Sequence, residues 1–158
     1  MSFSSTYFCF KKSYLLVSWT LVNSKLYTIS HVGKDGMQGK TFAEAKALCA
    51  GMGEGVTLYE PRDQETITAI FGKIQTSVWL NVEQVGNSGE FRYISDGTTI
   101  PTNSDFWKED EPNDVNERCA NIIPEGLWND IPCESKMNVL CQKEIGTFSK
   151  LYSNNDLN

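Results

Sequence analysis

The sequence predicts an α+β domain with two helices, small antiparallel sheets and a long loop region. Two segments, 41–49 and 62–74, each begin at a helix-capping residue and carry apolar residues at helical spacing. The segments around them are short and are either alternating or uniformly apolar, which is typical of strands. From 96 to 115 turn-forming residues dominate, and a run of this length usually carries function. Two helices followed by short strands and long loops indicate an α+β arrangement.

The first helix is predicted from "TFAEAKALC", residues 41–49. Thr41 and Glu44 have the spacing of a capping box, and glycines just after the segment end the helix. One face of this helix is apolar and consists of Phe42, Ala45, Leu48 and Cys49. The second helix is predicted from "RDQETITAIFGKI", residues 62–74, with Asp63 as its N-cap.

Seven segments have the composition of strands. They are 25–30, 56–61, 77–82, 89–95, 119–123, 127–131 and 138–144. "SVWLNV" is apolar almost throughout and predicts a buried strand, whereas "GEFRYIS" alternates and predicts a half-buried one. These segments define a predicted domain over 25–144, followed by a tail over 145–158.

Residues 1–24 allow two interpretations. "KKSYLLVSWTLV" places a basic pair before a modest apolar run, loosely as in a signal peptide. Alternatively, residues 14–22 form an edge strand or a pre-domain segment of the fold, and we favour this interpretation.

Composition and charge argue against several classes of function. The chain of 158 residues is long enough for one domain with a hydrophobic core. Its net charge of −6 argues against a nucleic-acid binder, because phosphates require a basic surface. No apolar run approaches the roughly 20 residues of a membrane span. The single histidine, His31, cannot form a histidine-based zinc site and is expected at the surface.

The cysteines predict disulfides rather than a metal or redox motif. They are Cys9, Cys49, Cys119, Cys133 and Cys141. No two of them form a C-x-x-C pair, which argues against structural zinc and thioredoxin-like chemistry. The four in the body of the chain suit two disulfides in an oxidising compartment, so we expect a secreted or extracellular protein. Cys9 is left free, bonded to another chain, or absent from the mature protein.

Oxygen-donating side chains concentrate in "EPNDVNERC" (111–119) and "WND" (128–130). The donors are Glu111, Asn113, Asp114, Glu117, Asn129 and Asp130. Carboxylate and amide oxygens suit Ca²⁺, which takes about six to eight of them, although the spacing is not that of an EF-hand. A cis bond before Pro112 would let the flanking side chains point at one centre. The alternative is an ordinary polar turn, which "WND" and the flanking cysteines make the weaker interpretation.

"EPN", "WND", "VWLNV" and the frame of four cysteines together resemble a C-type lectin carbohydrate-recognition domain. "FAEAKALC" and "GLWNDIPC" are most similar to its collectin and mannose-binding branch. The resemblance extends over about 25–144 and implies a C-type lectin-like fold. It also implies disulfides between Cys49 and Cys141 and between Cys119 and Cys133.

The resemblance implies one Ca²⁺ ion that is also the sugar-binding element. Its ligands are implied to be Glu111, Asn113, Glu117, Asn129 and Asp130. Two neighbouring sugar hydroxyls are implied to coordinate the ion, with the asparagine amides as donors to them and the glutamates as acceptors. The "EPN" order implies a preference for mannose, N-acetylglucosamine, fucose and glucose, whereas "QPD" accompanies galactose. The expected partners are mannose-type glycans, such as those on microbial surfaces.

The sequence departs from the family at a second, auxiliary Ca²⁺ site. The matching positions fall on Gln84 and Ser88, and the residue after Glu117 is Arg118. Asp114 and Glu117 alone are too few anionic groups to hold an ion, so we expect this site to be lost. Loss of this site is expected to affect how the long loop is ordered without ligand, and hence the affinity for Ca²⁺.

The remaining apolar residues near the site receive different roles. Trp79 and Trp128 lie in strand-like segments and are expected in the core, whereas Trp107 is assigned either to the core or to loop support. Val115 is expected to contact a bound sugar. A single exposed site binds one sugar weakly, so several copies, as in a homo-oligomer, are expected to act together, and Cys9 offers one link.

Two other functions are compatible with these residues. A glycoside hydrolase would use two of Glu111, Glu117 and Asp130, but carboxylates packed among asparagines suit a cation better than acid catalysis, so we do not expect an enzyme. A C-type lectin-like domain that binds protein without Ca²⁺ is the second alternative. Its usual sign is a broken "EPN" or "WND", and both are intact here.

Overall fold

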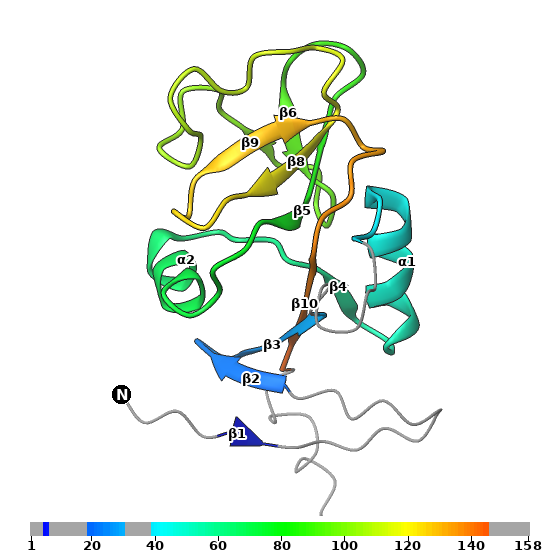
Figure 1. Ribbon diagram of the computed structural model, residues 1–158, viewed down its shortest axis with the longest axis vertical. Coiled ribbons are helices and arrows are strands. Elements are labelled where there is room, and N and C mark those ends of the chain that lie inside the picture. Colours follow the sequence, from blue (N-terminus) through cyan, green and yellow to red (C-terminus); the bar gives the residue numbers. More distant parts are fainter. Residues whose placement is uncertain (1–4, 7–18, 31–38, 146–158) are drawn as a thin grey trace, which may run out of the picture.

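Two antiparallel sheets and two helices form the part of the chain that the computed structural model describes, which is residues 5–6, 19–30 and 39–145 (Figure 1). The first sheet lies at the bottom of Figure 1 and the second at the top, with the helices between them. In order, the first sheet consists of β1 (Ser5–Thr6), β2 (Trp19–Val22), β3 (Lys25–Ser30), β10 (Val139–Glu144) and β4 (Val56–Leu58). The predicted α+β class is confirmed.

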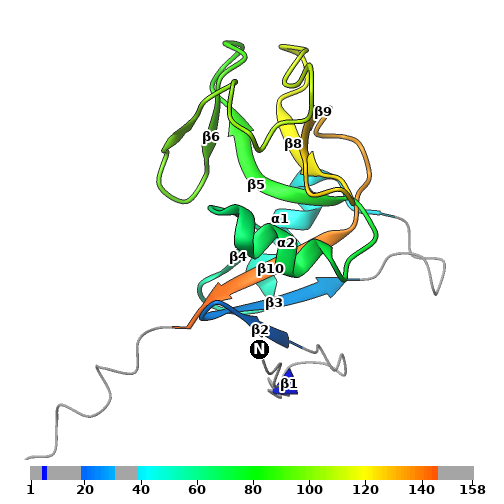
Figure 2. The same cartoon turned by 90° about the vertical axis from the view of Figure 1, so that its left-hand side faces the viewer.

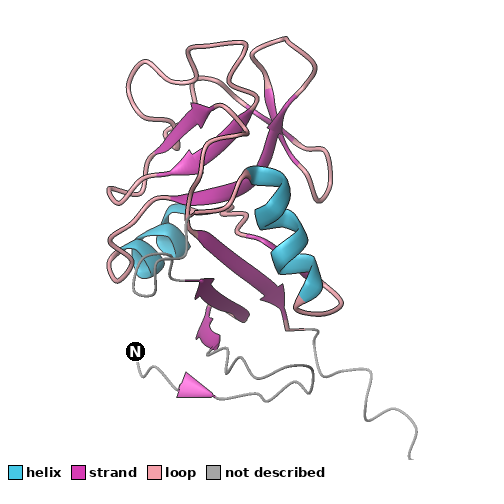
Figure 3. Ribbon diagram, turned by 45° about the vertical axis from the view of Figure 1, so that its right-hand side comes forward, coloured by secondary structure: helices cyan, strands magenta, loops and turns pink. Residues whose placement is uncertain are grey.

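The second sheet carries the loops at the far end of the molecule (Figures 2 and 3). In order, it consists of β7 (Thr99–Ile100), β6 (Phe91–Tyr93), β5 (Val78–Gln84), β8 (Cys119–Ile122) and β9 (Trp128–Ile131). Its central strand, β5, is buried along nearly its whole length, as its apolar sequence predicts. In the β8–β9 pair, Ala120 lies opposite Asp130 and Asn121 opposite Asn129. This pairing brings "WND" alongside the strand that follows the "EPN" loop.

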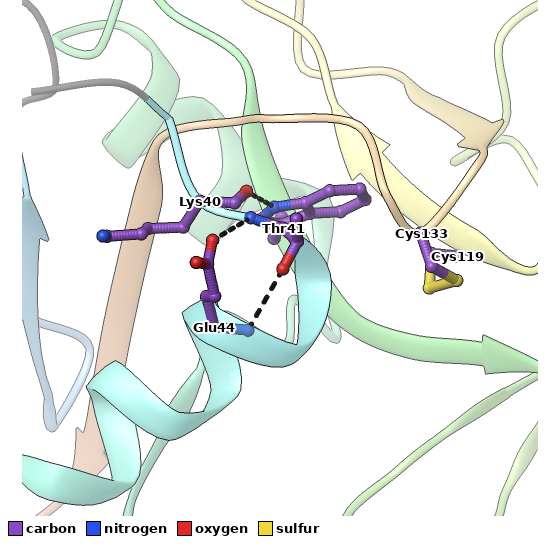
Figure 4. The surroundings of a disulfide bond; sticks show 6 residues. Lys40, Thr41, Glu44, Cys119 and Cys133 are labelled. Atoms are coloured by element: carbon purple, nitrogen blue, oxygen red, sulfur yellow. Dashed lines mark hydrogen bonds between the residues drawn. A yellow bond between two sulfur atoms is a disulfide. The ribbon is translucent and has the colours of Figure 1, made fainter.

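The first helix, α1 (Phe42–Gly51), begins with the predicted capping box. Thr41 Oγ1 accepts from the Glu44 amide, and the Glu44 carboxylate accepts from the Thr41 amide, so two amides at the helix start are satisfied (Figure 4). Nearby, the Trp79 indole donates to the Lys40 carbonyl oxygen at 2.7 Å. The Phe42 amide donates to the Cys133 carbonyl oxygen at 3.0 Å. The start of α1 is therefore tied to the second sheet.

The second helix, α2 (Gln64–Phe71), is shorter than the predicted 62–74. Asp63 caps it as predicted, because its carboxylate accepts from the Thr66 amide at 2.7 Å. The helix ends at Gly72. Its buried residues, Thr66, Ile67, Ile70 and Phe71, face the space between the two sheets.

Apolar packing and two disulfides hold these layers together. One cluster lies between α2 and the two sheets and includes Tyr59, Leu80 and Trp128. The other lies under α1 and includes Phe42 and Trp79. Disulfides join Cys49 to Cys141 and Cys119 to Cys133, so both implied pairings are confirmed. The first bond links α1 to β10, and the second links β8 to the segment after β9.

Besides the shorter α2, and β4, which ends at Leu58 rather than at residue 61, the structure departs from the sequence prediction in three further strands. The segment expected to lack regular structure contains β7, which pairs with β6. The predicted strand over 89–95 shortens to Phe91–Tyr93, because its ends turn into loops. The segment expected as an edge strand contributes β2, which lies between β1 and β3 and is not at the edge.

Some predictions fall on residues that the structure does not describe. They concern Cys9, residues 14–18, His31 and the tail beyond Ile145. Among the described residues, no helix has the length and apolar character needed to cross a membrane.

Candidate functional site

The candidate site lies between the loop after β7 and strand β9, at the end of the molecule away from the first sheet (Figure 2). The bond between Glu111 and Pro112 is cis, as the sequence analysis anticipates. The loop that carries these residues is built from turns rather than strands, so side-chain contacts decide its shape.

Asp130 organises the site from β9. Its side chain is only 1% exposed. Both of its carboxylate oxygens accept from the Asn113 amide at 3.2 Å, and one accepts from the Asp114 amide at 3.1 Å. The "EPN" loop is thus bonded directly to the "WND" strand, so the two motifs lie side by side.

Glu111 stands next to Asp130, and one of its two carboxylate oxygens lacks a partner. Its Oε2 atom is buried and has no hydrogen bond within the described structure. Burial, then a hydrogen bond to Asp130 and the negative charge of Asp130 and Glu117, raise the pKa of Glu111 to about 7, against the opposing charge of Lys108. Two adjacent carboxyl groups can bond to each other only by sharing a proton, so without a cation this pair favours the protonated form of Glu111.

Glu117 experiences the same crowding. Burial, followed by the charges of Asp130 and Asp114, raises the pKa of the Glu117 carboxyl. The carboxylates of Glu111, Glu117 and Asp130 therefore crowd together, and the charge of Asp130 disfavours ionisation of the two glutamates. This electrostatic pattern is the one that a positive ion would relieve.

A tight turn presents Glu117. The Asn116 amide donates to Asp114 Oδ1 at 2.8 Å, and the Glu117 amide donates to the Asp114 carbonyl oxygen at 3.0 Å. Asp114 is thus used within the turn. Val115 lies in the same turn, and its side chain is 50% exposed.

Asn129 contributes an amide from β9. Its Nδ2 atom donates to the carbonyl oxygen of Asp130. The amide oxygen is the end suited to a cation. Asn113, across the site, is exposed.

These residues fit a calcium ion by their chemistry but do not enclose one with carboxylates alone. Across the described ranges, no three histidine, cysteine, aspartate or glutamate side chains converge as a group able to hold a metal. The two asparagine amide oxygens are therefore needed to complete a set of five hard oxygen donors. The buried, unpartnered oxygen of Glu111 is the observation that fits a cation most directly.

The aromatic side chains of Phe106, Trp107 and Trp128 form an aromatic base under the site, and the sequence predicts only part of it. The Trp128 amide donates to the Phe106 carbonyl oxygen at 2.8 Å, and the Lys108 amide donates to the Trp128 carbonyl oxygen at 2.9 Å. Phe106 stacks on Trp128 with ring centroids 4.9 Å apart. Trp107 is buried and meets Trp128 edge-on, so its role is both core and loop support. The aromatic pair inside an otherwise polar run was the available signal.

Trp79 and Trp128 are fully buried, which confirms their assignment to the core.

A second missed residue is Gln84, at the end of β5. The sequence indicates only a lost ligand position there, whereas the side chain of Gln84 is buried against the site loop. No local pattern distinguishes this glutamine from an exposed one, since the contact is made across the fold.

A family model described as the Lectin C-type domain matches residues 38–143. Among curated proteins, the hepatic lectin of Gallus gallus is 29% identical over 104 residues, which is 65% of this chain and 49% of that protein. CD209 antigen-like protein D of Mus musculus is 23% identical over 126 residues, which is 79% of this chain and 50% of that protein. The chain thus spans about half the length of these curated relatives.

Solved structures share the fold. The carbohydrate-recognition domain of the mouse scavenger receptor C-type lectin has a TM-score of 0.66 at 25% identity, covering 82% of this chain and 95% of that one. The C-type lectin domain of murine dendritic cell inhibitory receptor 2, solved in complex with N-glycan, has a TM-score of 0.66 at 26% identity, covering 80% and 96%. A calcium-independent type II antifreeze protein matches at 22% identity with a TM-score of 0.65, covering 80% and 91%, which concerns the fold alone.

Proposed function

Because the chain belongs to the C-type lectin domain family, whose members are non-enzymatic carbohydrate-binding proteins, we propose that it binds mannose-type sugars through one Ca²⁺ ion. Family membership answers the question of catalysis, since no hydrolase activity accompanies this domain. Three points go beyond family membership and are proposals: the similarity to the collectin branch, the requirement for calcium, and the preference for mannose-type sugars.

One observation carries the proposal. Glu111 has a buried carboxylate oxygen without a partner, and it lies beside the carboxylate of Asp130, with Glu117 close enough to add to the repulsion. A buried, unpaired anionic oxygen is costly unless a cation or a proton neutralises it. At neutral pH, Ca²⁺ is the partner suited to a site that also offers amide oxygens.

The proposed ligands are Glu111, Asn113, Glu117, Asn129 and Asp130. When bound, the ion supplies coordination positions for two neighbouring hydroxyl oxygens of a sugar. The chain itself supplies direction, because the amide nitrogens of the two asparagines donate to those hydroxyls and the two glutamates accept their protons. Asp130 fixes the relative position of the two motifs through its bonds to the loop amides.

The order of groups supports the proposed preference. In "EPN" the carboxylate precedes the amide, which favours mannose, N-acetylglucosamine, fucose and glucose over galactose. We further propose an extracellular protein that meets such glycans, for example on microbial surfaces, through more than one copy of the site, because a single exposed site binds a monosaccharide weakly. Two disulfides are consistent with an oxidising compartment.

A second candidate is a domain that binds protein without Ca²⁺. It is favoured by one observation, namely that the carboxylates of the described chain do not form a metal-holding group by themselves. Under this alternative, a proton shared with Asp130, rather than an ion, relieves the charge repulsion at Glu111, and the loop presents Val115 to a protein partner.

A glycan array with Ca²⁺ and with EDTA distinguishes the two candidates. The proposal predicts binding to mannose-type glycans that EDTA abolishes and that excess Ca²⁺ restores, with no released product. Retention on a mannose column in the presence of EDTA, or binding to no glycan at all, would count against the calcium mechanism. Calorimetric titration with Ca²⁺ alone then tests the ion separately from the sugar.

A further inference from the structure

Gln84 reaches the loop that carries Glu117 at two points. It is the last residue of β5, and its side chain is only 4% exposed. Its backbone amide donates to the Arg118 carbonyl oxygen at 2.9 Å. Its side-chain amide, in the orientation that satisfies its neighbours, donates to the carbonyl oxygens of Val115 at 3.0 Å and Gly86 at 3.1 Å. Gln84 thus bonds to the loop on both sides of Glu117.

The chemistry of this contact requires a donor. Two backbone carbonyl oxygens, from Val115 and Gly86, converge on one place and repel each other unless a cation or N–H groups lie between them. A glutamine amide has two N–H donors and no charge. It therefore satisfies both carbonyls and adds nothing to the negative charge of the carboxylates nearby. A carboxylate at the same position would face the carbonyls with lone pairs only.

The contact fixes the backbone that presents a proposed ligand. The turn from Asp114 to Glu117 is closed internally by the bonds of Asp114 to the Asn116 and Glu117 amides. Gln84 holds this turn against β5 at Val115 and at the residue after Glu117. The position of the Glu117 backbone is thus set by protein hydrogen bonds alone.

We propose that Gln84 is a positioning residue that holds the Glu117 loop in its binding conformation without a second ion, so that the site works with a single cation. This deepens the proposed function. It rests on that function for its calcium measurement, but not for its measurement of loop order.

The first test measures loop order in EDTA by hydrogen exchange of the amides in 113–117, read by mass spectrometry. Gln84→Met keeps the length of the side chain and removes both donors, and Gln84→Glu keeps its size and replaces the donors by acceptors. Because a buried hydrogen-bonded contact is lost, we expect about tenfold faster exchange in both variants. The matched control is Ser88→Ala. The Ser88 hydroxyl bonds to Val85 and Glu90 within its own hairpin, so in this variant the amides in 113–117 should exchange at the wild-type rate.

The second test is calorimetric titration with Ca²⁺. We expect one ion per wild-type chain, and about tenfold weaker binding with the same stoichiometry in Gln84→Met, because the ligand-bearing loop must then be ordered on binding. Near-UV circular dichroism verifies that each variant is folded. Two variants of Gln84 are used so that, if one of them does not fold, the other still tests the proposal.

The outcomes separate the two proposals. Wild-type exchange rates in the folded Gln84 variants, or two ions bound by the wild type, would overturn the role of Gln84. A wild-type chain that binds no Ca²⁺ would remove the proposed function, while faster exchange in the Gln84 variants would still support Gln84 as the residue that orders the loop.

Discussion

The two ends of the molecule are held by different forces. Around β3, β10, β4 and α1, buried apolar side chains and the disulfide between Cys49 and Cys141 hold elements that are 92 residues apart in sequence. At the other end, the loop from 101 to 118 is held by the Asp130 carboxylate, by the Gln84 amide and by an aromatic base. Carboxylates crowd together there, and burial raises the pKa values of Glu111 and Glu117.

This difference indicates that folding and ligand binding are separable. Apolar burial requires no ion and changes little with pH, so the first region should fold in the same way with or without ligand. The loop region stores charge repulsion, which a cation or protons remove. Variants in the first region should therefore change the free energy of unfolding, and variants in the second should change affinity.

The largest effect is expected on removing the disulfide of the first region with the double variant Cys49→Ala, Cys141→Ala. Loss of a cross-link that closes a loop of 92 residues should lower the free energy of unfolding by about 4–5 kcal/mol. Chemical denaturation measures this change. Calcium affinity of the folded fraction should remain near wild type.

The disulfide between Cys119 and Cys133 is the matched comparison. It closes a loop of 14 residues and joins the strands that flank the site. Its removal should cost less stability, about 3 kcal/mol, and should also weaken calcium binding. The comparison would fail if removal of the Cys49–Cys141 bond weakened calcium binding in the folded protein as strongly.

Next in size is the loss of proposed ligands. Asn129→Ala and Glu111→Gln should each weaken Ca²⁺ and mannose binding by about 100-fold or more, equivalent to about 2.7 kcal/mol, because each removes a ligand and a contact to the sugar. Glu111→Gln should leave the metal-free protein at least as stable at neutral pH, since it removes a charge that Asp130 and Glu117 repel. Calorimetry and thermal unfolding measure the two quantities.

Glu109→Gln is the control for Glu111→Gln. Glu109 is exposed and lies in the same acidic stretch, so neutralising it should leave both affinities within about twofold of wild type. Mannose binding that persisted in both ligand variants would refute the assignment of the site.

Acidification should weaken calcium binding from near neutrality downward. The pKa of Glu111 in the metal-free protein is raised to about 7, so protons compete with Ca²⁺ below that pH, and affinity should fall up to about tenfold per pH unit. In the metal-free chain, a raised carboxyl pKa contributes stability below the unfolded value, about 4.3, and this stability is lost as pH rises through about 7.

The stabilisation by Ca²⁺ should therefore shrink as the pH falls. Melting temperatures with Ca²⁺ and with EDTA, recorded between about pH 7.5 and 4, test this expectation, and the two curves should converge at the acidic end. A gap of constant width down to about pH 4 would be incompatible with carboxylate ligands.

Local signals explain how much of this comparison could be predicted from the sequence. The Thr41–Glu44 capping box and the Asp63 cap lie within a few residues of the helices that they begin, and both form as predicted. The sequence predicts one site for "EPN" and "WND" because oxygen donors concentrate in both segments and cysteines flank them. In each case the signal and the structure that it specifies lie close together in the chain.

Contacts across the fold explain what was missed. Two-residue strand β7 forms only because β6 lies beside it, and the run that contains it is otherwise rich in turn residues. In the sequence, Gln84 cannot be distinguished from an exposed polar residue, because its contact with the Val115 carbonyl oxygen is made only in the folded structure. Trp107 could not be assigned between core and loop support because its position depends on Trp128, in another strand.

The smallest predicted effect concerns the exposed Val115 side chain, which the two anchors of its turn hold at the edge of the site. Val115→Thr keeps its shape and replaces one methyl group by a hydroxyl. If Val115 packs on the sugar ring, mannose affinity should fall a fewfold, about 0.8 kcal/mol for the apolar group lost, with calcium affinity unchanged. Leu21→Thr, an exposed apolar residue on β2, is the control and should change neither. A parallel loss of calcium affinity in Val115→Thr would show that the residue shapes the turn rather than contacts the sugar. The Val115 side chain, and not only its carbonyl group, would then belong to the contacts that hold the loop region.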